Sequence, residues 1–158
     1  MKVRDFAKVQ PSTCRAEDSL RLAGETMRGV GCGVLPVVGP GDGLVGILTD
    51  RDICCALTRL DRRPSDVSVA EAMTSSVRTC SLGDPIVQAL ETMQNGRVRR
   101  LPVLDTSRRV VGLLSLDDIA AAAHVESGKR DDVTWREIGA TLHAISVHPV
   151  PQLLGRAS

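Results

Sequence analysis

The sequence predicts an α/β (α+β) fold built from two similar halves and followed by a C-terminal helix. Residues 13 to 57 align without a gap with residues 79 to 123 when the chain is shifted by 66 positions. Within each copy, short apolar runs alternate with stretches of helical periodicity. Two copies are fewer than a solenoid needs, so we expect two halves packed face to face around a pseudo-twofold axis.

Each half begins with a short strand and a helix. The strands are expected around Thr13 and Thr79. The first helix opens at Asp18-Ser19 in one copy and at Asp84-Pro85 in the other, because a capping residue or a proline favours a helix start. These helices are predicted to run to about Arg28 and Asn95, with Gly29 and Gly96 just past their ends.

A hairpin and a second helix complete each half. The apolar runs 35–38 and 44–48 flank the turn Gly41-Asp42-Gly43, and the runs 101–104 and 110–114 correspond to them in the second copy. A helix then opens at Thr49 or at Ser115. Each half therefore has the predicted order β-α-β-β-α.

We divide the chain into residues 3–60 (first repeat), 61–74 (linker), 75–125 (second repeat) and 126–158 (polar linker, helix and loose tail). Residues 69–73 are expected to form a short helical lead-in to the second copy. In the last part, Thr134 and Glu137 suit a capping box, and Trp135, Ile138, Leu142 and Ile145 share one helix face. That face either docks on its own domain or makes a dimer contact.

Composition excludes several classes of function. The 20 Lys and Arg residues nearly balance the 19 Asp and Glu residues, so no overall field attracts nucleic acid or an anionic membrane. Phe6 and Trp135 are the only aromatic residues, which leaves little for bases to stack on. A charged N-terminus and the lack of a long apolar segment predict a cytoplasmic protein with no membrane contact.

No enzyme motif is present, because GxSxG, HExxH, Walker A and GxGxxG strings are all missing, so we expect no catalytic role and no metal site. The five cysteines lack CxxC spacing. Cys14 and Cys80 occupy equivalent positions and permit a thiol sensor, although buried apolar thiols explain them as well. The scattered residues His124, His143 and His148 offer a weak metal-binding alternative.

The start of each second helix can be interpreted in two ways. Gly46 and Gly112 allow a strand to approach another backbone closely. Thr49 or Ser115 then opens a helix, and Asp52 or Asp118 stands three residues later, where a carboxylate could accept both hydroxyls of a ribose. The same spacing is also that of a capping box, in which the side chains satisfy only backbone donors.

The repeated strings resemble a known family. Leu35-Pro36-Val37-Val38 followed by residues 46–53, and Leu101-Pro102-Val103-Leu104 followed by residues 112–119, are similar to a tandem pair of CBS (cystathionine β-synthase) domains. The resemblance covers about residues 3 to 125. It implies a stand-alone Bateman module of bacterial type, a regulatory unit that forms disc-like homodimers and binds AMP, ADP, ATP, NAD or S-adenosylmethionine in its interdomain clefts.

The resemblance also implies two clefts with different linings. One would combine Ser115 and Asp118 with base-covering or phosphate-binding residues Ser12, Thr13, Gly33, Val34 and Pro36. The other would combine Thr49 and Asp52 with Val77, Thr79, Arg99, Arg100 and Pro102.

Charge makes the two expected clefts unequal. Arg97, Arg99 and Arg100 precede the second Leu-Pro, where the first copy has Gly31, Gly33 and Val34. Arginine forks suit phosphate oxygens, so the arginine side is the expected phosphate end, although a solvated surface or ion pairs across a dimer would explain these arginines too. Arg51 is equally ambiguous.

The resemblance therefore implies a regulatory homodimer that senses an adenosine-containing small molecule and acts on a separate, unknown effector protein. The alternative is a ligand-free interaction scaffold in which the two motifs serve only as helix caps. A thiol or metal sensor is the third interpretation. The sequence does not name the ligand or the pathway.

Overall fold

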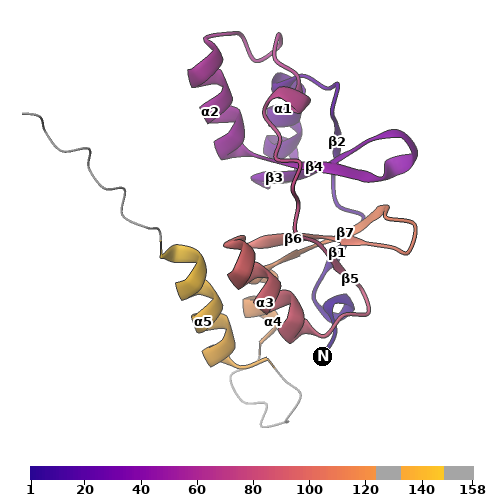
Figure 1. Ribbon diagram of the computed structural model, residues 1–158, viewed down its shortest axis with the longest axis vertical. Helices are drawn as coiled ribbons and strands as arrows, with labels where there is room; N and C mark the ends of the chain where they lie inside the picture. The colour runs from indigo at the N-terminus through magenta and orange to yellow at the C-terminus, as the bar shows by residue number, and fades with distance from the viewer. Residues whose placement is uncertain (124–132, 148–158) are drawn as a thin grey trace, which may run out of the picture.

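The computed structural model describes residues 1–123 and 133–147. They form two α/β halves stacked along the long axis of the molecule, with a separate helix, α5, beside the second half (Figure 1). The expected polar linker from residue 126 and the expected loose tail fall on residues 124–132 and 148–158, which lie outside the described residues. None of the described helices has the length and apolar character needed to span a bilayer.

The first half contains the predicted five elements. They are β2 (Cys14–Arg15), α1 (Leu20–Val30), β3 (Val34–Val38), β4 (Leu44–Thr49) and α2 (Asp50–Leu60). Strand β3 pairs in parallel with β2 and antiparallel with β4, so the sheet order is β2-β3-β4. All five residues of β3 are buried, which explains its continuous apolar run.

The second half repeats this arrangement with β5 (Cys80–Ser81), α3 (Ile86–Gly96), β6 (Arg100–Leu104), β7 (Val110–Ser115) and α4 (Leu116–Ala122). Strand registers correspond across the repeat: Val34 faces Thr49 in the first hairpin, and Arg100 faces Ser115 in the second. The predicted β-α-β-β-α order is therefore confirmed in both copies.

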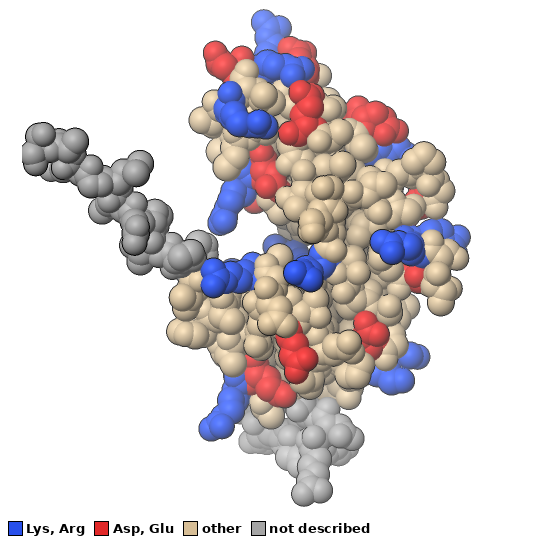
Figure 2. Space-filling model, in the orientation of Figure 1, with Lys and Arg blue, Asp and Glu red and all other residues tan. Residues whose placement is uncertain are grey.

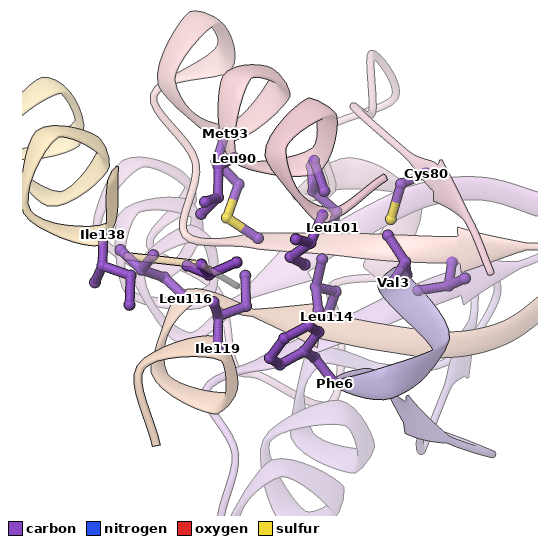
Figure 3. Close-up of a cluster of buried hydrophobic side chains, with 14 of the residues drawn as sticks. Val3, Phe6, Cys80, Leu90, Met93, Leu101, Leu114, Leu116, Ile119 and Ile138 are labelled. Carbon is purple, nitrogen blue, oxygen red and sulfur yellow. The ribbon is translucent and has the colours of Figure 1, made fainter. Parts of the chain in front are cut away.

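The halves exchange their lead-in segments. The short 3-10 helix η1 (Val3–Asp5) and the strand β1 (Lys8–Val9) belong to the second half, because β1 pairs with β7 in the sheet β1-β7-β6-β5. Figure 3 shows Phe6 close to Leu114 and Ile119 in that half's core.

Conversely, the short 3-10 helix η3 (Val69–Glu71) and the residues just before it place Val67 and Val69 in the core of the first half. The short lead-in over residues 69–73 thus packs on the first copy rather than leading into the second. Burying a lead-in segment against the opposite copy holds the two halves together. No local sequence pattern distinguishes packing on the segment's own copy from packing on the other one.

The helix ends differ slightly from those expected. Ser19 is the N-cap of α1, whereas Asp18 and Asp84 instead accept hydrogen bonds from the backbone N–H groups of Arg15 (2.7 Å) and Ser81 (2.8 Å). These two carboxylates therefore fix the turn before each helix. Helices α1 and α3 end at Val30 and Gly96, slightly later than the expected ends at Arg28 and Asn95, and their C-caps Gly31 and Arg97 are both left-handed.

Helix α5 (Trp135–Ser146) has the predicted capping box between Thr134 and Glu137 and packs on α3 and α4. Its buried face was predicted only in part. Ile138 and Ile145 are buried, but Trp135 and Leu142 are 51% and 44% exposed. Thr141 lies on the buried side instead, where its hydroxyl accepts a hydrogen bond from Gln94 Nε2 at 2.8 Å and donates to the Glu137 carbonyl.

Candidate functional site

A cleft of about 630 Å³ lies where the two halves meet. The end of β4 and the start of α2 form one wall, and the segments 74–78 and 95–100 form the other. Its size is that of a typical small-molecule site. Figure 2 shows lysine and arginine side chains gathered along the level at which the two halves join.

Asp52 has one carboxylate oxygen committed and one free. Its Oδ2 accepts hydrogen bonds from the backbone N–H (2.9 Å) and the hydroxyl (2.7 Å) of Thr49, which is the N-cap of α2. Its Oδ1 accepts no hydrogen bond from any described residue. The capping box therefore exists, yet it leaves an acceptor at the cleft for a ligand hydroxyl.

The cleft is strongly basic. Five arginines line it against two aspartates, namely Arg51, Arg78, Arg97, Arg99 and Arg100 against Asp50 and Asp52. Within the described part of the chain, only Arg100 among these five makes an ion pair, a long one of 3.8 Å to Asp117. Guanidinium groups that lack carboxylate partners are suited to bind phosphate oxygens.

Arg97 stands in an uncommon backbone conformation. It follows the last residue of α3 with φ of 50° and ψ of 41°, in the left-handed region. Gly31 caps α1 in the same way with φ of 65°. A glycine adopts this conformation at lower cost, so the arginine at the cleft position carries some backbone strain that the first copy avoids.

Most residues expected around Thr49 and Asp52 line this cleft. Val77, Arg99 and Arg100 do so, whereas Thr79 and Pro102 are not among the lining residues. Pro102 is buried within β6, opposite Leu113.

A grouping of Gly33 and Val34 with Ser115 and Asp118 stays a prediction. Both residues line the cleft of Thr49 and Asp52, where they were not expected. The reason is the β3–β4 hairpin, in which Val34 pairs with Thr49 and the Asp50 N–H donates to the Gly33 carbonyl at 3.1 Å.

The second motif is arranged differently. Ser115 caps α4 by accepting a hydrogen bond from the Asp118 N–H at 3.0 Å, and its hydroxyl donates to Asp118 Oδ2. The other oxygen, Oδ1, pairs with Lys8 Nζ at 3.0 Å. Both carboxylate oxygens of Asp118 are thus occupied. A ligand cleft that joins this motif to Ser12, Thr13 and Pro36 stays a prediction.

Sequence reasoning missed several lining residues. Asp50, Thr74, Ser76, Arg78 and Asn95 all border the cleft. The segment 74–78 directly precedes the expected strand around Thr79, so its position beside the cleft could have been inferred from that strand. The position of Asn95 could not have been inferred, because it depends on where α3 ends.

The pseudo-equivalent thiols are poorly suited to redox sensing. Cys14 and Cys80 are buried, and burial, assisted by the nearby Asp18 and Asp84 carboxylates, raises the pKa of each thiol to about 12. A thiolate is the reactive form, so these two thiols are held unreactive near neutral pH.

The described residues include no group of three or more His, Cys, Asp or Glu side chains placed to hold a metal ion. His143 lies exposed on α5, whereas His124 and His148 fall outside the described residues.

The duplicated fold, the exchanged lead-in segments and the cleft at the joint define a paired regulatory module. The CBS domain family matches residues 3–59 and 69–125, so the chain belongs to the CBS domain family and carries two copies in tandem. Hypoxic response protein 1 of Mycobacterium tuberculosis is 34% identical over 109 residues, which cover 68% of this chain and 76% of that protein.

Three further comparisons bear on function. Homoserine O-acetyltransferase of Methanosphaerula palustris is 32% identical over 122 residues, but the chain spans only 23% of its length. The crystal structure of the CBS domain pair of protein MJ0100 in complex with 5-methylthioadenosine and S-adenosylmethionine superposes with a TM-score of 0.70 at 29% identity, over 77% of this chain and 94% of that one. The crystal structure of hypoxic response protein 1 with two coordinated zinc ions gives 0.71, also at 29% identity, over 77% and 98% of the two chains.

Proposed function

We propose that the chain is a regulatory module that binds a phosphorylated, adenosine-containing ligand in the cleft between its repeats. The observation that carries this proposal is the juxtaposition in one cleft of a free Asp52 Oδ1 and five arginines. A carboxylate oxygen accepts the hydroxyls of a ribose, and guanidinium groups neutralise phosphate charge. The adenosine ligands in the related MJ0100 pair support the nucleoside part.

Charge favours some adenosine ligands over others. S-adenosylmethionine carries a positive sulfonium centre and would meet a surplus of arginines. AMP, ADP, ATP and NAD present phosphate oxygens instead. We therefore expect phosphorylated ligands to bind this cleft more tightly than S-adenosylmethionine or free adenosine.

The mechanism that fits this geometry is a population shift. A ligand that contacts both repeats binds one mutual arrangement of them better than another and so favours that arrangement. The regulated output passes through a homodimer to a separate effector protein, and the module itself contributes regulation rather than catalysis.

The experiment is a thermal-shift and calorimetry panel on the full chain with AMP, ADP, ATP, NAD, S-adenosylmethionine and adenosine. A ligand at 100 times its dissociation constant contributes about 2.7 kcal/mol, which raises the melting temperature of a protein of this size by roughly 5 to 10 °C. A phosphorylated ligand should give this shift.

Asp52→Asn tests the ribose contact, and we expect it to weaken binding at least tenfold. Asp61→Asn removes the same charge outside the cleft, at a left-handed position that asparagine tolerates, and should leave affinity unchanged. If no ligand in the panel shifts the wild-type protein, the proposal fails and the ligand-free scaffold is favoured.

A further inference from the structure

The two motifs have equivalent neighbours at one position, and these neighbours differ in charge. A shift of 66 residues places Lys8 on Thr74. Thr74 pairs with Ile47 through two backbone hydrogen bonds of 2.9 Å, and Lys8 pairs with Leu113, the residue equivalent to Ile47.

The glycines beside these pairs confirm the equivalence. A Cβ added at Gly46 would lie 3.2 Å from the Thr74 carbonyl oxygen, and one added at Gly112 would lie 3.1 Å from that of Lys8. The Thr74 and Lys8 backbones therefore approach β4 and β7 almost equally closely. What differs is the side chain that each presents beside the acidic motif.

That difference decides the state of the carboxylate. Thr74 borders the cleft in which Asp52 keeps Oδ1 free. Lys8 instead places its ammonium 3.0 Å from Asp118 Oδ1, while Ser115 holds Oδ2. A ribose approaching Asp118 therefore competes with a cation that the chain itself supplies, on a Lys8 side chain that is 75% exposed.

The remaining charges reinforce the asymmetry. Arg51, Arg78 and Arg97 of the described cleft correspond to Asp117, Ser12 and Gly31. The central pair Arg99 and Arg100 corresponds to Gly33 and Val34, and all four residues line the described cleft. If the repeat symmetry holds, the same four residues would line a cleft at the second motif. That cleft would therefore keep Arg99 and Arg100 but would lack the other three arginines. It would attract phosphate less strongly even if Asp118 were freed.

We propose that Lys8 is a specificity-determining residue that closes the second motif, so that the chain binds one nucleotide, at Asp52. This inference rests on the proposed nucleotide-binding function. Lys8 acts as an internal counter-ion at the position where the first motif has the small neutral side chain of Thr74. The ligand is thereby confined to the arginine-rich cleft.

The test is isothermal titration of the full chain with ADP, with AMP and ATP as parallel titrants. We expect one ADP per chain, a loss of at least tenfold in affinity in Asp52→Asn, and a change of less than twofold in Asp118→Asn. Two equivalents of ADP in the wild type, or equal losses of affinity in the two variants, would overturn this inference and leave the proposed function standing. If the wild type binds none of the three nucleotides, the proposed function fails and the inference fails with it.

Exchanging the two side chains tests the role of Lys8 itself. Thr74→Lys should weaken ADP binding at least tenfold by pairing with Asp52, although added positive charge alone would strengthen binding of an anion. Thr74→Met has similar length without charge and should stay within threefold of the wild type. Tighter binding in Thr74→Lys, or equal losses in both variants, contradicts the ion-pair explanation.

Lys8→Thr provides the reverse test and does not require that the Thr74 variants fold. We expect a second, weaker ADP equivalent to appear, which Asp118→Asn in the same background removes. A stoichiometry that remains at one in Lys8→Thr would show that Lys8 does not close the motif.

Discussion

Single residues at the cleft combine structural and binding roles. Thr49 and Asp52 cap α2 and yet leave Asp52 Oδ1 available, because a capping box uses only one oxygen of its carboxylate. The two interpretations that the sequence left open are therefore compatible at Asp52. At Asp118 the capping hydroxyl and Lys8 occupy both oxygens, and a ligand would have to compete with them.

Arg97→Gly should separate ligand binding from stability. Glycine relieves the left-handed strain at this helix end, so we expect the free energy of unfolding to rise by up to about 1 kcal/mol. The affinity for ADP should fall several-fold, because one guanidinium leaves the cleft, while the weak binding of adenosine should not change. Denaturant unfolding and calorimetry measure the two effects. A variant that is less stable, or that binds ADP as tightly as the wild type, would contradict this role for Arg97.

Sequence alone could single out Thr49, Asp52, Arg99 and Arg100, because they adjoin short motifs that recur at a fixed offset. It could not identify the Lys8–Asp118 pair, since Lys8 belongs to a lead-in segment that crosses to the other half. The place of Gly33 and Val34 in the cleft of Asp52 was also missed, because the expected grouping did not use the antiparallel register of their own hairpin.

At the scale of the secondary-structure elements, the close approach of neighbouring backbones within β7 makes Gly112 sensitive to substitution. A Cβ at Gly112 would meet the Lys8 carbonyl oxygen at 3.1 Å and Val103 Cβ at 3.2 Å, both parts of ordered strands. We expect Gly112→Ala to lower the free energy of unfolding by about 1 to 3 kcal/mol, the usual cost of overpacking. Denaturant unfolding provides the measurement.

Gly24→Ala is the matched control, because nothing lies within 4 Å of a Cβ at this position in α1. There alanine should stabilise the protein by about 0.5 to 1 kcal/mol, as expected for a helix interior. A neutral or stabilising Gly112→Ala would mean that β1 does not pack as closely on β7 as described.

The β6–β7 turn should lose stability in acid. Asp105 accepts hydrogen bonds from the Arg109 and Ser107 backbone N–H groups, both 2.9 Å, and the Arg109 side chain adds a third. Chiefly because of the Arg109 N–H, the pKa of this carboxyl lies below its usual 3.8. A depressed folded-state pKa stabilises the protein above the unfolded pKa, and this stabilisation is lost as the pH falls through the folded value.

Asp105→Asn should therefore be less stable than the wild type near neutral pH, with the difference shrinking as the pH drops below about 4. Unfolding free energies measured for both proteins across this range provide the check. A difference that does not depend on pH would show that the carboxylate charge contributes nothing to the turn.

At the scale of the whole molecule, the sequence predicted the duplicated β-α-β-β-α order because each copy carries its own turn and capping signals. The C-terminal helix was predicted with its capping box, but its buried face was only half correct. Thr141 is buried because Gln94 on α3 provides a hydrogen-bond partner, and a pattern based on apolar residues cannot include such a pair.

The proposed homodimer can be tested through its mass. Each chain has a mass of 16.9 kDa, so light scattering coupled to gel filtration should give twice that value for the free protein. Saturating ADP should preserve the dimer and change its hydrodynamic radius, because the ligand favours one arrangement of the repeats. A monomer at micromolar concentration with and without ADP would contradict the proposed route of regulation.

The most direct measurement is a crystal structure of the full chain with ADP. It should show the ribose hydroxyls within about 3 Å of the Asp52 carboxylate and the phosphates among Arg97, Arg99 and Arg100, with Lys8 still paired to Asp118. Nucleotide density at Asp118 with the Asp52 cleft empty, or phosphates directed away from these arginines, would contradict the account.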